Sequence, residues 1–141
     1  MRLWEDRLAD EGFRITEPRR AVMQVLQSAQ APLSPKDIQA RGEAIHADLG
    51  LTTVYRTVAL LRDLGLVRRV HRGDGCRGYV AVSPGHRHHV ICQVCGRTVE
   101  FPGSTDLAGL IRLVEKSTGY RVEGHLLQLF GRCPDCQEKE L

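Results

Sequence analysis

Two pairs of cysteines constrain the fold of this chain more than any other feature. Cys92 and Cys95 form one C-x-x-C pair, and Cys133 and Cys136 form a second. Four thiolates presented in this way make a closed, tetrahedral zinc site. The 37 residues between the pairs exceed the roughly 15 to 20 of a compact zinc ribbon. The spacing therefore predicts a small domain between the pairs, clamped at its base by a structural Zn²⁺.

Two other classes of protein carry cysteines in such patterns. One is a redox-switched interaction protein that uses its thiols or its zinc, although no thioredoxin-like βαβ pattern precedes either pair. The other is a zinc hydrolase or deaminase, which needs an open coordination position and a general base. The deaminase pattern His-x-Glu is not met, because His86-Arg87-His88 lacks the glutamate. We therefore expect no enzyme and no small-molecule substrate.

The first 82 residues are predicted to form four helices followed by a two-stranded wing. Helix starts are indicated by Thr16 and by Ser34 with Asp37, which is the pattern of a capping box. The remaining features follow from apolar periodicity and turn residues. The first helix is expected at 3–12, and the third is expected to place Ile45 in the core. The fourth helix is expected to be capped by Thr52 or Thr53 and to end at Gly65. Strands are expected at 66–71 and 78–82, joined by an Asp74-Gly75 turn.

After a linker at Ser83-Pro84-Gly85, the pattern predicts a second, α/β unit. Strands are expected at 88–92, 97–101 and 121–131, and His125 would lie in the middle of the last. A helix is expected at 105–118, with its apolar residues Leu107, Leu110, Ile111 and Val114 packed inward. The fold class is therefore α+β: an N-terminal winged helix (1–82), a hinge (83–86) and a small zinc-stapled C-terminal domain (87–141).

Charge fits two interpretations, contact with nucleic acid or a chance imbalance of three charges, and hydropathy predicts a cytoplasmic protein. Residues 1–80 carry 13 Lys/Arg and 10 Asp/Glu, whereas residues 81–141 carry 7 of each. This small positive excess in the first half fits contact with nucleic acid. No apolar run is long enough to cross a membrane, and the charged N-terminus lacks a signal-peptide core. We expect a cytoplasmic location and no membrane partner.

A cluster of histidines precedes the first cysteine pair. In an extended segment, alternate side chains share a face, so His86 and His88 point one way and Arg87 and His89 the other. His125, Glu100 and Asp106 can add an imidazole and two carboxylates. Mixed ligands of this kind suit an exchangeable Zn²⁺, Fe²⁺ or Mn²⁺. The cluster therefore predicts a second, regulatory metal site.

The start of the fourth helix has the composition of a DNA-reading element. Thr52 and Thr53 can donate to phosphate, and Tyr55 and Arg56 project from the first turn, where Arg pairs with guanine and Tyr packs on a thymine methyl. Basic residues nearer the N-terminus, among them Arg14 and Arg19, can add phosphate or minor-groove contacts.

With these motifs the sequence resembles the ferric uptake regulator family over nearly its whole length. The matching segments are Gly12–Arg19, Gly50–Arg56, the His-rich run into Cys92-x-x-Cys95, and Phe130–Cys136. The resemblance implies a homodimer that represses metal-homeostasis or oxidative-stress genes at AT-rich palindromic operators when its regulatory metal is bound. It implies that the C-terminal unit is the dimerisation and metal-sensing domain.

The resemblance also assigns roles to single residues. It places Arg14 at the minor groove, Tyr55 and Arg56 at bases, and the four cysteines on structural zinc. It assigns His86, His88 and His125 to one regulatory site, with Asp106 as a substitute for the usual carboxylate. At a second regulatory site of the family this sequence departs from the usual pattern. Three of the family's ligand positions hold residues that do not bind metal: Pro32, Val80 or Val82, and Arg87. Of the usual ligands only His89 and Glu100 are present, and the candidate replacements are His71 and Cys76.

Overall fold

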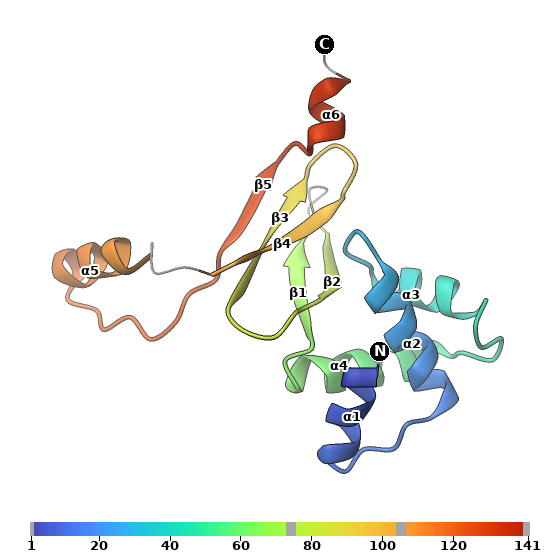
Figure 1. Ribbon diagram of the computed structural model, residues 1–141. Coiled ribbons are helices and arrows are strands. Elements are labelled where there is room, and N and C mark those ends of the chain that lie inside the picture. Colours follow the sequence, from blue (N-terminus) through green and yellow to red (C-terminus); the bar gives the residue numbers. More distant parts are fainter. Residues whose placement is uncertain (1, 73–75, 104–106, 140–141) are drawn as a thin grey trace.

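The computed structural model describes residues 2–72, 76–103 and 107–139. Within these residues, four helices and a hairpin form an N-terminal unit, and a three-stranded sheet with two further helices forms a C-terminal part (Figure 1). This organisation confirms the predicted α+β class. The elements are α1 Arg2–Asp10, α2 Glu17–Ser28, α3 Pro35–Gly42, α4 Leu51–Asp63, β1 Val67–His71, β2 Arg77–Ala81, β3 Arg87–Cys92, β4 Thr98–Pro102, α5 Leu107–Thr118, β5 Gln128–Gly131 and α6 Pro134–Glu138.

Two of the predicted helix starts are confirmed. The hydroxyl of Thr16 accepts a hydrogen bond from the backbone N–H of Arg19 at 3.3 Å, which caps α2. Ser34 and Asp37 form the predicted capping box of α3: each side chain accepts from the other residue's backbone N–H, at 3.1 and 3.0 Å. These bonds satisfy amide groups that have no partner inside the helix.

Two expectations about the N-terminal helices are wrong. Gly50, not Thr52 or Thr53, is the N-cap of α4, and both threonines lie inside its first turn. Ile45 lies beyond the end of α3 and is 48% exposed. Leu49 packs against Gly42 instead: a Cβ on Gly42 would lie 2.4 Å from Leu49 Cδ2. Leu49 therefore fills the core position that was expected for Ile45.

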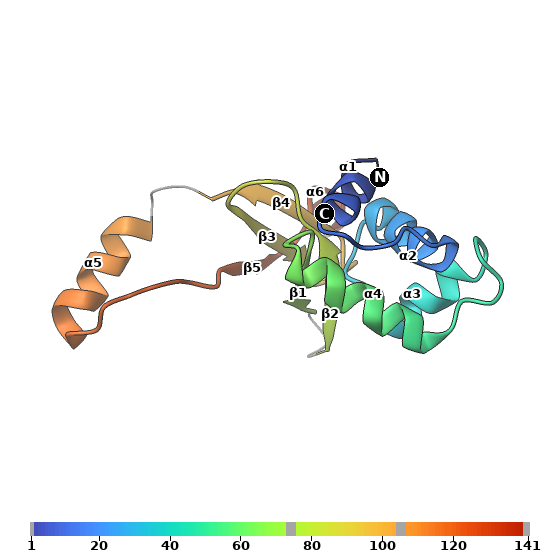
Figure 2. The ribbon, with the colours of Figure 1, turned by 90° about the horizontal axis from the view of Figure 1, so that it is seen from below.

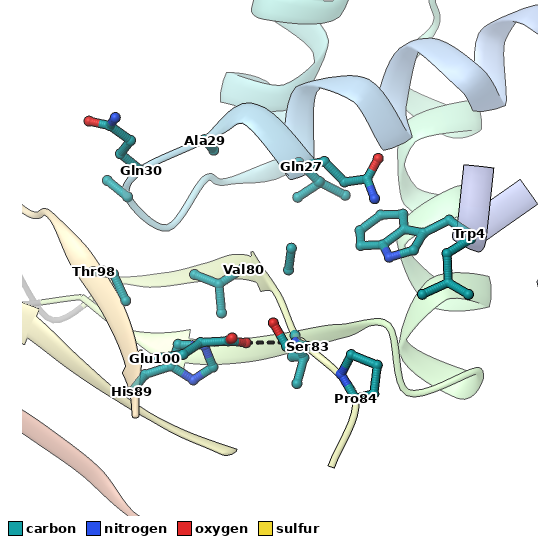
Figure 3. Close-up of a pocket in the computed structure, with 15 residues that line it drawn as sticks. Trp4, Gln27, Ala29, Gln30, Val80, Ser83, Pro84, His89, Thr98 and Glu100 are labelled. Carbon is teal, nitrogen blue, oxygen red and sulfur yellow. Dashed lines mark hydrogen bonds and ion pairs between the residues drawn. The ribbon is translucent and has the colours of Figure 1, made fainter. Parts of the chain in front are cut away.

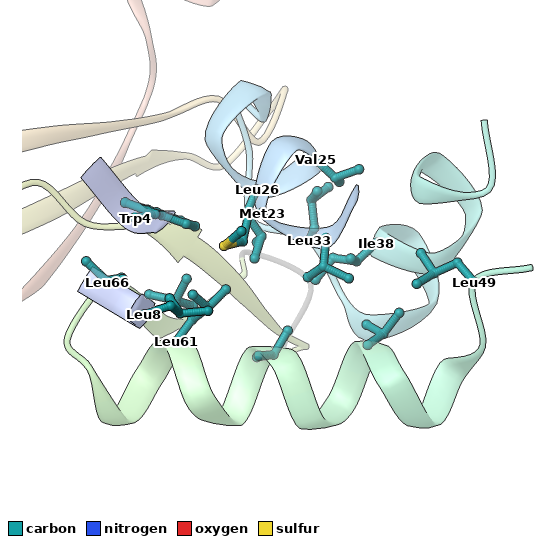
Figure 4. Close-up of a cluster of buried hydrophobic side chains, with 14 residues drawn as sticks. Trp4, Leu8, Met23, Val25, Leu26, Leu33, Ile38, Leu49, Leu61 and Leu66 are labelled. Atoms are coloured by element: carbon teal, nitrogen blue, oxygen red, sulfur yellow. The ribbon is translucent and has the colours of Figure 1, made fainter. Parts of the chain in front are cut away.

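The N-terminal unit has one continuous apolar core (Figure 4). Trp4 and Leu8 of α1 pack with Met23 and Leu26 of α2 and with Leu61 of α4, and all five are nearly inaccessible to solvent. Leu66 and Val67 extend this core to the start of the hairpin. The hairpin β1–β2 is antiparallel, and its predicted Asp74-Gly75 turn lies outside the described residues.

The C-terminal sheet has the order β4-β3-β5, with β3 antiparallel to β4 and parallel to β5. β5 is shorter than predicted, because residues 119–127 have no regular structure and form the return from α5. His125 thus lies ahead of the strand and not in its middle. The short helix α6 was not predicted.

Helix α5 stands away from the rest of the chain (Figures 1 and 2). The prediction that its apolar residues pack inward is wrong for the single chain, because none of its residues is buried. Leu110 and Leu113 are 56% and 64% exposed. Among the residues that the structure describes, no helix is both long and apolar enough to span a membrane.

Candidate metal centres and nucleic-acid interface

The four cysteines of the two C-x-x-C pairs converge at one end of the C-terminal sheet. Cys92 ends β3, and the parallel pairing of β3 with β5 sets it beside Gly131, two residues before Cys133. The turn after Cys95 is closed by Gly96, whose φ of 80° favours glycine. The four Sγ atoms lie within 4.8 Å of one another. The structure thus brings the predicted zinc ligands together.

The environment of these thiols fits a zinc ion. The Sγ of Cys92 accepts backbone N–H bonds from Cys95 and Cys133, at 3.5 and 3.4 Å. These amide dipoles lower the pKa of the Cys92 thiol to about 5, whereas the neighbouring Cys133 sulfur raises the pKa of Cys136 to about 12. Four cysteine sulfurs at this spacing are the donor set of a closed tetrahedral site, in which zinc binding deprotonates all four.

A cation lies against this cysteine cluster. The Arg97 guanidinium donates to the Cys133 Sγ at 3.6 Å and to the Asp135 carboxylate. Asp135, followed by Cys133, raises the pKa of Arg97. Sequence reasoning did not select Arg97, although its position two residues after Cys95 is the signal that could have found it.

The three histidines assigned to one regulatory site also converge. The ring nitrogens of His86, His88 and His125 lie within 4.8 Å of one another, and the Nε2 atoms of His86 and His125 are 2.8 Å apart. His88 lies in β3 and His86 directly precedes this strand, and their rings are neighbours with centroids 4.6 Å apart, as the alternation of an extended segment predicts. His125 comes from the irregular segment that precedes β5, so the cluster joins two parts of the chain.

A divalent ion fits this triad for two reasons. His88 is only 5% exposed, and its Nε2 is a buried nitrogen without a hydrogen-bond partner. Burial, followed by the charges of His86 and His125, lowers the pKa of His88, which favours the neutral imidazole that metals bind. Gly103 makes room for the ring of His86, because a Cβ there would lie 2.5 Å from His86 Cδ2. Sequence reasoning missed this glycine.

His89 of β3 and its pairing partner Glu100 of β4 lie on the opposite face of the sheet, which faces the N-terminal unit (Figure 3). His89 Nε2 is 3.6 Å from the Glu100 carboxylate, which accepts the backbone N–H of Ser83 at 2.7 Å. On the other side of the ring, Nδ1 lies 3.5 Å from the Arg68 guanidinium. Burial, followed by the positive charge of Arg68, lowers the pKa of His89. The residues around the pair line a cavity of about 430 Å³ between α1, α2 and the sheet.

The other predicted regulatory ligands are not gathered into these clusters. His71 uses its backbone to pair with the amide of Gln128, and its side chain is exposed. Cys76 is exposed and directly precedes β2. Neither belongs to a group of three or more possible ligands among the described residues. Asp106 lies outside the described residues.

The first half of α4 presents the predicted DNA-reading residues to solvent. Thr52, Tyr55 and Arg56 are exposed, whereas Val54 and Thr57 are buried, so one helix face packs on the core and the other is open. The N-cap Gly50 has no side chain to satisfy the first amides, which leaves them accessible to an anion. Thr53 is half-buried, and Arg14 is exposed while its carbonyl accepts from Arg19 Nη1 at 2.8 Å.

Comparison with known proteins gives a consistent result. A model of the ferric uptake regulator family matches residues 10–130. The peroxide operon regulator of Bacillus subtilis is 33% identical over 135 residues, which cover 94% of this chain and 90% of that protein. The ferric uptake regulation protein of Yersinia pestis is 33% identical over 137 residues, with 94% and 91% covered.

A solved structure of a zinc uptake regulator in complex with zinc and DNA has a TM-score of 0.76 to this chain. The alignment covers 98% of this chain and 93% of that one, at 20% identity. At that identity the similarity shows the fold alone, and it supports the winged-helix and C-terminal organisation described above.

Proposed function

The chain belongs to the ferric uptake regulator family, and we propose that it is a metal-dependent repressor that binds AT-rich palindromic operators as a homodimer. The family consists of metal-responsive transcriptional regulators. The proposed targets are genes of zinc or iron uptake or of the oxidative-stress response. One observation carries the proposal: His86, His88 and His125 converge, and the buried Nε2 of His88 has no partner.

We propose the same domain boundaries as the sequence suggested: residues 1–82 bind DNA, 83–86 are a hinge, and 87–141 bind metal and dimerise. The continuous core of the N-terminal unit ends at the hairpin, which supports the first boundary. Gly85, with a φ of 98°, lies in the segment between β2 and β3 and gives the hinge its turn.

The proposed dimer rests on the uncovered apolar surface of the C-terminal part. Leu110, Leu113 and Val114 of α5 are exposed, and so are Leu129 and Phe130 of β5. No residue of α5 is buried in its own chain, although an amphipathic helix normally buries its apolar face against another element. A second copy of the chain has the same surface, and a two-fold contact would cover both.

The metal would be held by three imidazoles. Such a nitrogen-rich set favours zinc or iron(II) over manganese, which prefers oxygen ligands. Asp106 stays the proposed carboxylate ligand. The sequence also predicted His89, Glu100, His71 and Cys76 as ligands. Among the described residues, His71 and Cys76 join no group of three or more possible ligands, and His89 and Glu100 contact Arg68 and Ser83.

The position of His125 suggests how metal binding changes the affinity for DNA. His125 belongs to the segment that links α5 to β5, whereas His86 is the last residue of the proposed hinge and His88 lies in β3. Holding these residues together fixes the proposed dimer helix relative to the sheet that carries the DNA-binding unit. Metal would then select one spacing of the two units in the dimer, with Tyr55 and Arg56 in successive major grooves.

The test combines metal analysis with DNA selection. The protein is treated with chelator, reloaded with Zn²⁺, Fe²⁺ or Mn²⁺, and used to select sequences from a random duplex library. We expect one chelation-resistant zinc, one exchangeable ion, and an AT-rich palindrome bound about 5–150-fold more tightly with that ion. The variants His86→Ala and His125→Ala should lose the exchangeable ion, whereas Cys76→Ser should keep it.

Equal DNA affinity with and without the exchangeable ion would contradict the proposal. So would retention of the second ion by His125→Ala. The ion that gives the greatest gain in DNA affinity identifies the regulatory metal.

A further inference from the structure

The N-terminal unit and the C-terminal sheet meet through polar contacts. The backbone N–H of Thr98 donates to the Gln30 carbonyl at 2.8 Å. The amide side chain of Gln128 bonds the N–H and the carbonyl of His71 at the end of β1, at 3.0 and 2.6 Å. Arg68 makes a further contact, which differs from these two because it brings a full charge.

Arg68 reaches from β1 of the wing to β3 of the sheet. Its Nη1 donates to the backbone carbonyl of Arg87 at 2.6 Å and lies 3.5 Å from Nδ1 of His89. The His89 side chain is 3% exposed, and beyond it Glu100 accepts the N–H of Ser83 in the hinge. A row of polar groups thus runs from the wing through β3 and β4 to the hinge (Figure 3 shows its last three members).

The charges along this row suit a fixed contact. Arg68 is cationic at one end and Glu100 is anionic at the other, with the His89 ring between them. Hydrogen bonds that involve a charged group are stronger than those between neutral groups. Arg68 is half-buried, whereas its neighbour Arg69 is exposed, because successive residues of a strand point to opposite faces.

We propose that Arg68 is a positioning residue for DNA binding: it holds the wing against the C-terminal sheet and makes no contact with DNA. An arginine on the wing of a DNA-binding domain is ordinarily expected to contact phosphate. Here the Nη1 of the guanidinium is directed to the Arg87 carbonyl and the His89 ring instead. By holding the wing against β3, Arg68 fixes the orientation of α4 relative to the C-terminal sheet. This effect does not depend on the regulatory metal.

This inference rests on the proposed function for its link to DNA but not for the contact itself. The test therefore has two independent readouts. Hydrogen–deuterium exchange on the full-length, zinc-loaded protein reports the contact. The salt dependence of affinity for the selected duplex reports whether a phosphate contact is lost, because each such contact adds about 0.9 to the slope of log affinity against log salt.

The variants are Arg68→Gln, Arg68→Lys and, as the matched control on the opposite face of the same strand, Arg69→Gln. Arg68→Gln should speed exchange in β1 and in residues 83–87 and weaken DNA binding about tenfold with an unchanged salt slope. Arg68→Lys keeps the charge but loses the planar guanidinium, which contacts both the Arg87 carbonyl and the His89 ring. This variant should therefore resemble Arg68→Gln. Arg69→Gln should leave exchange at the hinge unchanged.

A salt slope that falls by about one in Arg68→Gln, with full DNA binding by Arg68→Lys, would overturn the proposal in favour of a phosphate contact. Unchanged exchange in Arg68→Gln would overturn the contact itself. If the wild-type protein binds no duplex but exchange rises in Arg68→Gln alone, the proposed function fails and the Arg68 contact stands.

Discussion

The guanidinium of Arg97 donates a hydrogen bond to the Sγ of Cys133, 3.6 Å away. Four thiolates around Zn²⁺ carry a net charge of two minus, and Arg97 offsets part of it. Groups that hydrogen-bond to metal ligands commonly change metal affinity by about 10- to 100-fold. Asp135, which also accepts from Arg97, keeps the guanidinium in place.

Arg97→Gln should therefore release zinc to a chelator about tenfold faster than the wild type. Arg97→Lys keeps the charge and should fall between the two, and Arg112→Gln on α5 serves as a distant control. Zinc release is followed with a colorimetric chelator. Equal release from Arg97→Gln and Arg112→Gln would show that the cation does not retain the metal.

Gly103 should be intolerant of a side chain because it lies against His86. In Gly103→Ala the new Cβ would lie 2.5 and 2.6 Å from two carbons of the His86 ring, so the ring must shift from its position beside His125. We expect weaker binding of the exchangeable ion by about tenfold or more, with the cysteine-bound zinc retained. Gly109→Ala is the matched control, because its Cβ meets nothing within 4 Å. Metal titration by calorimetry measures both, and equal affinities would contradict the prediction.

The apolar face of α5 should control oligomeric state. Leu110→Glu places a charge on the exposed apolar face and should turn the proposed dimer into a monomer, because burying an unpaired carboxylate is costly. Ala108→Glu makes the same change of charge at a neighbouring exposed position and should leave the dimer intact. Light scattering coupled to size exclusion gives the mass. A dimer in both variants would place the interface elsewhere.

Asp37 should make the stability of the N-terminal unit depend on pH. The Ser34 backbone N–H, more than the nearby Arg72, lowers the pKa of Asp37 below its ordinary 3.8. A carboxylate with a lowered folded-state pKa stabilises above its unfolded-state pKa and loses that effect as pH falls through the folded value. Asp37→Ala removes one half of the capping box and should lower the free energy of unfolding by about 0.5–1 kcal/mol near pH 6, a small effect because the side chain is 45% exposed and solvent screens its charge.

The deficit of Asp37→Ala should shrink as the pH falls below 3.8. Denaturant titrations of wild type and variant at matched pH measure the difference, in which acid effects common to both proteins cancel. A deficit of the same size at pH 3 and pH 6 would show that ionisation of Asp37 does not contribute.

Local patterns predicted much of the fold because the decisive contacts are local. The capping box of Ser34 and Asp37 and the turn at Gly65, with its φ of 75°, depend on residues a few positions apart. Ile45 was misplaced because its alternative, Leu49, reaches the core only through a close approach at Gly42. No periodicity in the sequence signals such an approach.

The metal sites were predictable in their ligands but not in their surroundings. Cysteine spacing and strand alternation were sufficient to group Cys92 with Cys133 and to separate His88 from His89. The roles of Arg68 and Arg97 depend on strands that meet from distant parts of the chain. The apolar pattern of α5 was recognised, but a single sequence does not say whether such a face packs on its own chain or on another.

The parallel pairing of β3 with β5 also dictates an order of events during protein synthesis. The helices and hairpin of the N-terminal unit need only residues that have already emerged from the ribosome, so this unit folds first. Cys92 and Cys95 must then wait until the chain has been extended through α5 to Cys133 and Cys136. A nascent chain stalled within α5 would therefore have a folded N-terminal unit but only two of the four zinc ligands. It would be unable to respond to metal.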